Sequence, residues 1–297
     1  MRVLHLDTGR EARGGQWQAL HLMRALRAAG EEVRLLAHAG TMLLAEAKML
    51  GIQAEEAAAW RLRKWSQWAD IVHAHDARAH ADCALWCASP FVVSRRVAFP
   101  VKRGPMSRWK YSRAALYLAV SRAVESELAK AGVPPGRIRV VYDAAPLPAV
   151  PGRRDGGVVA LDTKDPLKGK AVIEAARVGA EFTARLMEAL EHARVFVYIT
   201  ESEGLGSAAL AALAHGVPVV ASRVGGLPEI IRHEETGLLV DRNEPALVRA
   251  AVLRLLDDGV LAARLGDAGR RMVEREFSIE KMLERTVSAY REVTCIE

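Results

Sequence analysis

The feature that most constrains this chain is segment 199–231, ITESEGLGSAALAALAHGVPVVASRVGGLPEII. The apolar run at residues 195–199 predicts a buried parallel strand, and the Ala/Leu-rich stretch that follows Ser207 predicts a helix. The turn between them contains Gly204 and Gly206, which let a ligand approach the backbone closely. Unpaired N–H groups at a helix start favour an anion, so this segment predicts a phosphate site.

A second predicted strand, residues 217–222, ends in another Gly-Gly turn before Pro228 and Glu229. In the first half of the chain, predicted strands at residues 3–6, 33–37 and 71–75 alternate with helical segments. Alternation of this kind predicts an α/β fold with parallel sheets that are covered by helices on both faces. Loops at the carboxyl edge of such a sheet are where ligands bind.

Length and composition allow two domains. With 297 residues, of which 51% are hydrophobic, the chain can form two domains of about 130 to 150 residues each. A proline-rich stretch without periodicity is the linker candidate. We therefore expect an N-terminal domain at 1–146, a linker at 147–157, a second domain at 158–276 and a terminal helix at 277–297.

The sequence shows no secretory signal and no uncharged run as long as the roughly 18 residues of a membrane span, so we expect a cytosolic protein. Its three cysteines and its histidines lack the spacing of a zinc site. We therefore expect neither a metal nor another cofactor.

A basic segment runs from Arg95 to Arg113 without an acidic residue and includes Lys102 and Arg103. It gives a preference for anionic partners, although a solvated surface is an equally good explanation. No nucleic-acid-binding module accompanies it, so we expect no nucleic acid. Contact with an anionic membrane surface, or an anionic acceptor bound by Arg95, Arg96, Lys102 and Arg103, fits better.

Taken whole, segment 199–231 resembles the donor-binding segment of family 4 glycosyltransferases, which are retaining enzymes of the GT-B fold. Further likenesses are the Gly14-Gly15 pair, the run DIVHAHD at 70–76, and the run from Leu118 to Val141. The resemblance implies two Rossmann-like domains that face each other across a cleft. It also implies that the terminal helix at 277–297 packs back on the N-terminal domain, although an amphipathic surface helix of the C-terminal domain is an equally good explanation.

Roles for individual residues follow from this resemblance. His75 corresponds to a residue beside the transferred sugar, and we assign His73 to the other face of the strand. Glu203 corresponds to a carboxylate that faces the donor sugar, with a helix N-cap as its alternative role. The donor's phosphates would be held by backbone and lysine groups, which are Gly14, Gly15, Lys164, Lys168, Gly204, Leu205, Gly206 and Ser207. Retaining enzymes of this class need no protein nucleophile.

Two single-residue departures from the family pattern affect the nucleotide. A second glutamate that would accept from the ribose is replaced by Ala211. The family has an arginine five residues before its lysine, and that arginine is also absent. Val159 stands five residues before Lys164, and Thr163 stands five residues before Lys168. One of the two lysines can still reach the phosphates, as a point charge without the guanidinium fork.

The third departure is a shortening. The family carries two more strands between the predicted helix at 171–176 and the strand at 195–200, whereas residues 177–194 predict one or two helices and no strand. We therefore expect a C-terminal sheet of about four strands, with residues 158–161 as a new edge strand.

The sequence thus favours a retaining, metal-independent glycosyltransferase that moves a sugar from a nucleotide-activated donor to an anionic glycan or lipid-linked acceptor. The alternative is a catalytically silent relative that acts as a binding or partner subunit, which Ala211 and the shortening suggest. A nicotinamide-dependent oxidoreductase is disfavoured, because neither Gly-rich turn has the GxGxxG spacing.

Overall fold

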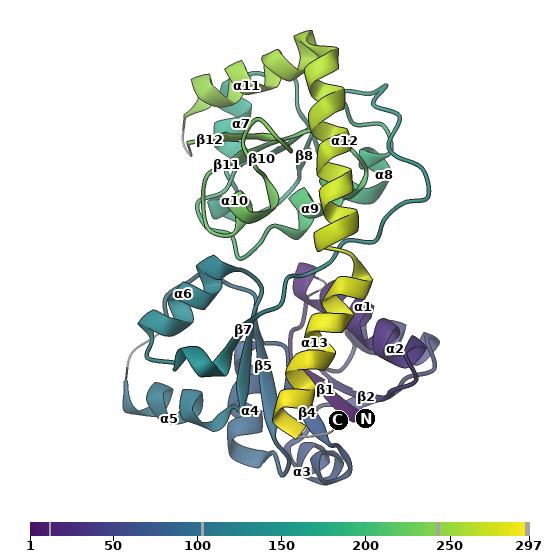
Figure 1. Ribbon diagram of the computed structural model, residues 1–297, viewed down its shortest axis with the longest axis vertical. Coiled ribbons are helices and arrows are strands. Elements are labelled where there is room, and N and C mark those ends of the chain that lie inside the picture. The colour runs from purple at the N-terminus through teal and green to yellow at the C-terminus, as the bar shows by residue number, and fades with distance from the viewer. Residues whose placement is uncertain (12, 102–103, 242–243, 295–297) are drawn as a thin grey trace. The chain divides into compact units, whose positions relative to one another are not determined.

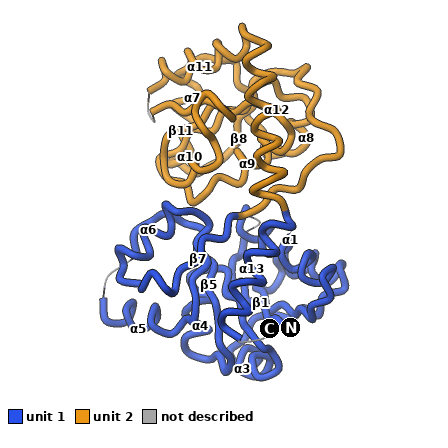
Figure 2. The backbone as a smooth tube through the Cα atoms, viewed as in Figure 1, with its two compact units in different colours: residues 1–142, 279–297 blue, residues 143–278 orange. Residues whose placement is uncertain are grey.

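The computed structural model describes residues 1–11, 13–101, 104–241 and 244–294. The chain divides into two compact units, which Figure 2 distinguishes by colour. Unit 1 contains Met1–Tyr142 and Ile279–Glu297, and unit 2 contains Asp143–Ser278. The division falls four residues before the end of the N-terminal domain expected from the sequence, and the last helix belongs to unit 1.

Unit 1 is a seven-stranded parallel sheet with the order β3-β2-β1-β4-β5-β6-β7. Its strands are β1 (Arg2–Asp7), β2 (Glu32–Ala37), β3 (Gln53–Glu56), β4 (Ile71–Ala74), β5 (Phe91–Arg95), β6 (Leu116–Ala119) and β7 (Ile138–Val140). Its helices are α1 (Gly14–Ala28), α2 (Met42–Met49), α3 (Ala59–Trp68), α4 (Ala77–Trp86), α5 (Pro105–Arg113), α6 (Arg122–Lys130) and α13 (Ile279–Thr294). This is the doubly wound arrangement that alternating strands and helices predict.

Local sequence signals fix several helix starts in unit 1. The Asp76 carboxylate accepts from the amides of Arg78 and Ala79 at 2.8 and 2.9 Å and caps α4. Ser121, predicted as an N-cap, accepts from the Val124 amide at 3.1 Å and caps α6. The capped helices α4 and α6 therefore begin directly after β4 and β6, at the carboxyl edge of the sheet.

Helix α13 closes one side of unit 1. It contacts α1, β4 and β6, and its place beside α1 and β4 can be followed in Figure 1. Tyr290 on this helix is fully buried, as is Ala289 beside it. The end of the chain therefore contributes a side chain to the interior of the N-terminal fold.

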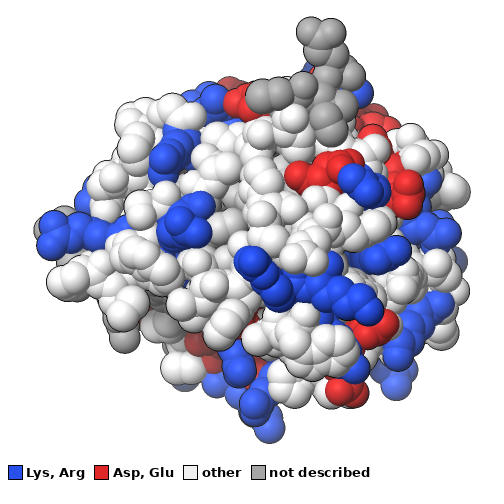
Figure 3. All heavy atoms as spheres, turned by 90° about the horizontal axis from the view of Figure 1, so that it is seen from below, with Lys and Arg blue, Asp and Glu red and all other residues white. Residues whose placement is uncertain are grey.

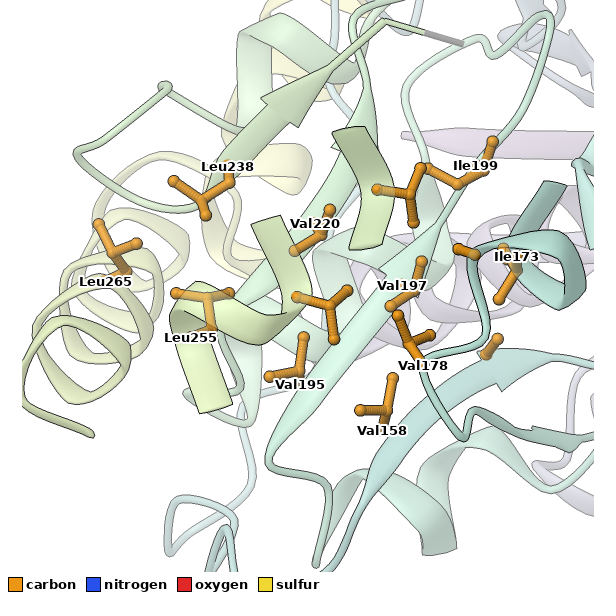
Figure 4. Close-up of a cluster of buried hydrophobic side chains, with 14 of the residues drawn as sticks. Val158, Ile173, Val178, Val195, Val197, Ile199, Val220, Leu238, Leu255 and Leu265 are labelled. Carbon is orange, nitrogen blue, oxygen red and sulfur yellow. The ribbon is translucent and has the colours of Figure 1, made fainter. Parts of the chain in front are cut away.

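Unit 2 is a five-stranded parallel sheet with the order β12-β11-β10-β8-β9. Its strands are β8 (Val158–Leu161), β9 (Glu181–Thr183), β10 (Val195–Tyr198), β11 (Val219–Ser222) and β12 (Leu238–Val240). Its helices are α7 (Lys170–Ala176), α8 (Leu186–Leu190), α9 (Ser207–Ala214), α10 (Leu227–Ile230), α11 (Pro245–Asp257) and α12 (Gly259–Glu276). Figure 4 shows the aliphatic side chains of the sheet meeting those of α7, α11 and α12.

The prediction that residues 177–194 contain no strand is wrong. β9 pairs in parallel with β8 through Val159 and Glu181, so β8 is not an edge strand and the sheet has one strand more than expected. Three residues are too few to show a period of two, and Glu181 is exposed at the sheet edge. Only the strand's position beside β8 identifies it.

None of the helices among the described residues is both long enough and apolar enough to cross a membrane.

Candidate functional site

In unit 2, the loop after β10 is tied to both neighbouring loops. The Thr200 amide donates to Ser222 Oγ at 2.9 Å, at the end of β11. Its hydroxyl donates to the Leu167 carbonyl at 3.1 Å, in the loop after β8. The turn that carries Glu203 is therefore held between the two loops that flank it at the carboxyl edge of the sheet.

The second Gly-Gly turn packs directly on this one. The Gly226 amide donates to the Glu203 carbonyl at 3.2 Å. A Cβ atom at Gly225 would lie 1.9 Å from the Glu203 carbonyl oxygen, and one at Gly226 would lie 2.2 Å from that of Gly204. Only glycine fits at these two positions, so the two predicted turns form a single structure.

Helix α9 begins at this turn without a side-chain cap. Gly206 is its N-cap with φ of 108°, and a Cβ there would lie 2.6 Å from Leu227 Cδ2. The first intrahelical bond runs from the Leu210 amide to the Gly206 carbonyl at 2.9 Å. The amides of the first turn, residues 207–209, therefore have no intrahelical acceptor and are available to an anion.

A charged group adjoins the helix start. Lys168 Nζ lies 2.6 Å from Glu203 Oε2 and 3.0 Å from the Tyr198 hydroxyl, which itself donates to Glu203 Oε2. The other carboxylate oxygen accepts from the Gly204 amide at 3.0 Å. Burial, followed by the Glu203 charge, raises the pKa of Tyr198 well above its ordinary value, so the phenol keeps its proton. An ammonium has three N–H donors, and these contacts leave one for a ligand.

The structure distinguishes between the alternatives that the sequence left open here. Lys168 joins the turn, whereas Lys164 is exposed and makes no hydrogen bond or ion pair to any described residue. Glu203 is not a helix N-cap, because Gly206 takes that position. Ala211 lies one turn after Ser207 on the only half-exposed stripe of α9, where the family's second glutamate would stand.

In unit 1, the predicted glycine pair also lies at a helix start. Gly14 and Gly15 are the first two residues of α1, directly after the N-cap Arg13. A Cβ at Gly15 would lie 3.6 Å from Arg96 Cδ, so this pair faces a basic side chain. Both predicted phosphate-binding glycine motifs thus present free helix amides.

Three imidazoles form a buried cluster near this pair. β1 and β4 are adjacent, with His5 opposite His73 in the register, and His75 follows β4. His5 Nδ1 lies 2.8 Å from His75 Nε2. His73 bonds the Tyr290 hydroxyl at 2.6 Å and Ser94 Oγ at 2.7 Å.

The assignment of His73 to the opposite face of the strand is wrong. The rings of His73 and His75 have centroids 4.0 Å apart. Residues two positions apart on a strand point to the same face, so the alternation places the two histidines together.

Arg96 fixes the direction of the hydrogen bonds in this cluster. Its guanidinium can only donate, and Nη1 lies 3.3 Å from His75 Nδ1. His75 therefore accepts at Nδ1 and donates from Nε2 to His5, which leaves the proton of His5 on Nε2. That nitrogen is buried and has no hydrogen-bond partner among the described residues.

The cluster is uncharged near neutral pH. Burial, with a smaller effect of Arg96, lowers the pKa of His5 to about 3. Burial and the neighbouring rings also hold the pKa values of His73 and His75 well below 6.5. His75 is 6% exposed and His5 is 0% exposed, so His75 is the ring of this pair that a ligand can touch.

The three histidines are also close enough to be considered as metal ligands, since their nitrogens lie within 4.8 Å of one another. Five of the six ring nitrogens already bond Arg96, Ser94, Tyr290 or another ring of the cluster. A cation would have to displace these partners beside a guanidinium, so the donor set fits a metal poorly.

The two described residues of the expected anion patch, Arg95 and Arg96, have different partners. Arg96 faces His75, whereas Arg95 donates to the Tyr111 hydroxyl at 3.1 Å and to the Phe99 carbonyl. Lys102 and Arg103 lie outside the described residues. Figure 3 shows Lys and Arg side chains in several separate groups on the face of the molecule that it presents.

The sequence did not identify three residues of these two sites. Tyr198 appeared only as part of an apolar strand, although an aromatic hydroxyl just before the turn is a polar signal. His5 occupies a predicted strand beside the His73 strand, and a histidine in each of two neighbouring strands could have suggested a contact. Tyr290 lies 217 residues from its partner His73, and nothing in the sequence pairs them.

Two family models match the chain in succession. The model described as Glycosyltransferase Family 4 matches residues 12–145, and that described as Glycosyl transferases group 1 matches residues 178–272. The chain is 33% identical over 106 residues to N-acetyl-alpha-D-glucosaminyl L-malate synthase of Bacillus anthracis. It is 39% identical over 108 residues to D-inositol 3-phosphate glycosyltransferase of Acidothermus cellulolyticus. Each match covers 36% of this chain but only 28% and 24% of those relatives.

Solved structures share the fold over nearly the whole chain. The crystal structure of Anabaena Alr3699/HepE in complex with UDP matches with a TM-score of 0.86 and 14% identity, covering 98% of this chain and 100% of that one. The family models and the fold agree with the motifs of both units, and the chain therefore belongs to the family 4 glycosyltransferases, enzymes with the GT-B fold.

Proposed function

We propose that this protein transfers a sugar from a nucleoside-diphosphate donor to a hydroxyl of a glycan or lipid-linked acceptor, with retention of configuration. The bond from the anomeric carbon to the phosphate oxygen breaks, and that oxygen keeps the electron pair. The acceptor oxygen forms the new bond on the same face of the sugar, and its proton passes to the departing phosphate. This route requires no protein nucleophile.

One observation carries the donor half of this proposal: Lys168 and the free amides of α9 adjoin the same glycine turn. Fixed donors of this kind stabilise charge that develops on a leaving phosphate. From the described residues the Glu203 carboxylate accepts three hydrogen bonds, so one acceptor site remains for a sugar hydroxyl. The UDP of the structurally similar Anabaena protein supports a nucleotide donor.

Unit 1 carries further groups suited to a sugar and its phosphates. His75 is neutral, and a sugar hydroxyl could replace Arg96 as the hydrogen-bond donor to its Nδ1. The Gly14 and Gly15 amides can contact phosphate, and Arg96 adds a positive charge next to both groups. Because these amides and side-chain cations can balance the charge of the departing phosphate, we propose that transfer needs no metal ion. Activity should then be the same with and without excess EDTA.

The acceptor side of the proposal rests on the basic segment. Arg96 faces His75, so an anionic group of the acceptor could be held there. Exposed Phe99, Met106 and Trp109 lie in the same basic segment, which supports peripheral contact with an anionic membrane surface. We propose no role in nucleic-acid binding.

A screen of UDP-, GDP- and ADP-sugars for hydrolysis and for transfer tests the proposal. We expect turnover of at least one donor, abolished by Glu203→Ala and by His75→Ala. Absence of binding and turnover with every donor would overturn it.

The second candidate function is that of a catalytically silent binding subunit, which Ala211 favours because no carboxylate stands there to accept from a ribose. In that case the protein would bind a nucleotide sugar or a partner without turning it over. Donor turnover that disappears in folded Glu203→Ala would exclude this function.

A further inference from the structure

Unit 1 also contains a cavity at the carboxyl edge of its sheet. It has a volume of about 320 Å³ and lies at the carboxyl ends of β1, β2 and β3, between α3 and α4. This volume is at the lower end of the range typical of small-molecule sites, about 300 to 1,000 Å³. A single ring of hexose size is the kind of ligand that such a space suits.

Three charged side chains line the cavity without partners. They are Glu56 at the end of β3, and Arg78 and Asp82 on α4. None of the three side chains makes a hydrogen bond or an ion pair with a described residue. Arg78 and Asp82 are four residues apart, a spacing at which helix ion pairs form, yet they remain separate. Polar groups that converge on a cavity and lack protein partners are typical of ligand recognition.

Thr8 and His38 add polar groups to the lining, and the rest of the wall is apolar. Leu6 and Leu62 are nearly fully buried beneath it, and Ala57 and Ala58 provide small side chains along the loop after β3. Such a surface accepts the C–H face of a sugar or cyclitol ring while carboxylates accept from its hydroxyls.

The charge balance argues against an anionic ligand in this cavity. Two carboxylates face one guanidinium, so a phosphate would meet net negative charge. Burial, as the leading cause, raises the pKa of Asp82, while Arg78 lowers it. A neutral ligand rich in hydroxyl groups satisfies both carboxylates and the arginine without bringing further charge.

The cavity adjoins the loop of the candidate catalytic histidine. Thr8 lines it, and the Thr8 hydroxyl donates to Asp76 Oδ1 at 2.8 Å. Asp76 directly follows His75 in the chain. A ring in the cavity would therefore sit beside the loop that carries His75.

We propose that this cavity binds an uncharged, hydroxyl-rich ring of the acceptor, with Glu56 and Asp82 accepting from its hydroxyls and Arg78 donating to its oxygens. The inference rests on the proposed function, and it assigns an acceptor subsite whose ligand class differs from the anionic group that Arg96 would hold.

Saturation-transfer NMR on the full chain tests this, with UDP present to occupy the proposed donor site. The probes are methyl α-glucoside, methyl α-mannoside, methyl α-galactoside and myo-inositol as neutral rings, glucose 6-phosphate as an anion and glucosamine as a cation. We expect at least one neutral ring to bind, and Asp82→Asn or Glu56→Gln to weaken it about tenfold, as loss of a hydrogen bond to a charged group would do. Glu46→Gln, a carboxylate of α2 outside the cavity, is the matched control and should change nothing.

Three results would overturn the inference: no neutral ring binds, the two cavity variants leave binding unchanged, or the anion or cation binds more tightly in an Arg78- or Asp82-dependent manner. Calorimetry with UDP on the same samples separates this from the proposed function. UDP binding without any bound ring removes the acceptor subsite alone, whereas missing UDP binding removes the donor site. The probes can also be measured without UDP.

Discussion

In unit 2, the candidate site is one short stretch, from Tyr198 to Gly206, completed by Lys168 and by the Gly225-Gly226 turn. In unit 1, the imidazole cluster and its partners come from β1, β4, β5 and α13, and two of its members are 217 residues apart. The first site offers mainly backbone amides at a glycine turn. The second is a closed network of side chains in which each ring depends on its neighbours.

This difference has physical consequences. Backbone amides are present whatever the side chains are, so the turn in unit 2 depends on its glycines and on a few polar groups. A buried side-chain network loses a hydrogen bond and leaves a buried group unsatisfied when one member is removed. Substitutions should therefore affect ligand binding in unit 2, and both activity and stability in unit 1.

The largest effect is expected for His75→Ala. If this side chain lies beside the transferred sugar, as we propose, its loss should lower the rate of transfer by about a hundredfold or more. The matched control is His80→Ala, which removes another buried histidine of unit 1, one that bonds the Lys110 carbonyl. Transfer by folded His75→Ala within tenfold of the unaltered protein would contradict this role.

Acid should destabilise unit 1 next most strongly. The imidazoles bind protons in the unfolded chain below about pH 6.5, whereas His5 stays neutral in the fold until about pH 3. Stability therefore falls as the pH drops through this window, by about 2 kcal/mol at pH 5 for His5 alone.

Urea unfolding followed by tryptophan fluorescence measures this effect selectively, because all six tryptophans lie in residues 1–142. The variant His5→Leu should lose part of the pH dependence. An unfolding midpoint that is equal at about pH 7 and about pH 5 would show that the cluster is not buried and neutral.

Tyr198→Phe sharpens the comparison from the side of unit 2. It removes the hydroxyl that donates a hydrogen bond to Glu203 and accepts one from Lys168. The KM for the nucleotide sugar should therefore rise about tenfold, with a smaller change in kcat. Tyr117→Phe, which alters a buried tyrosine of unit 1, is the control. Equal effects of the two variants would mean that the Tyr198 hydroxyl has no specific role in binding the nucleotide sugar.

The smallest effect is a gain. Ala211→Glu places a carboxylate on the half-exposed stripe of α9, where family resemblance puts a ribose acceptor, at little cost in helix propensity. Calorimetry should show nucleotide binding tightened a few-fold. Unchanged or weaker binding would indicate that a ribose does not lie beside this position.

The same contrast explains what could be predicted from the sequence. The strand, turn and helix around Glu203 are contiguous, so their composition predicted these elements, whereas the choice between Lys164 and Lys168, the position of Glu203 outside the N-cap and the contact of Tyr198 required the structure. Side chains that meet only through the fold, such as Tyr290 and His73, leave no local signal. β9 was missed because three residues carry no periodicity, and the His73 error came from misapplying the alternation along a strand.

The most direct test of the donor site is calorimetric titration of UDP into the full chain and into two lysine variants. Lys168→Met should weaken UDP binding at least tenfold, since a charge-assisted contact to phosphate is lost. Lys164→Met alters a lysine of the same loop whose side chain makes no hydrogen bond or ion pair with any of the described residues, and this variant should bind UDP like the unaltered protein. None of the three proteins should bind uridine measurably. Equal affinities for UDP in both variants, or no UDP binding by the unaltered protein, would contradict a diphosphate held by Lys168 and the first turn of α9.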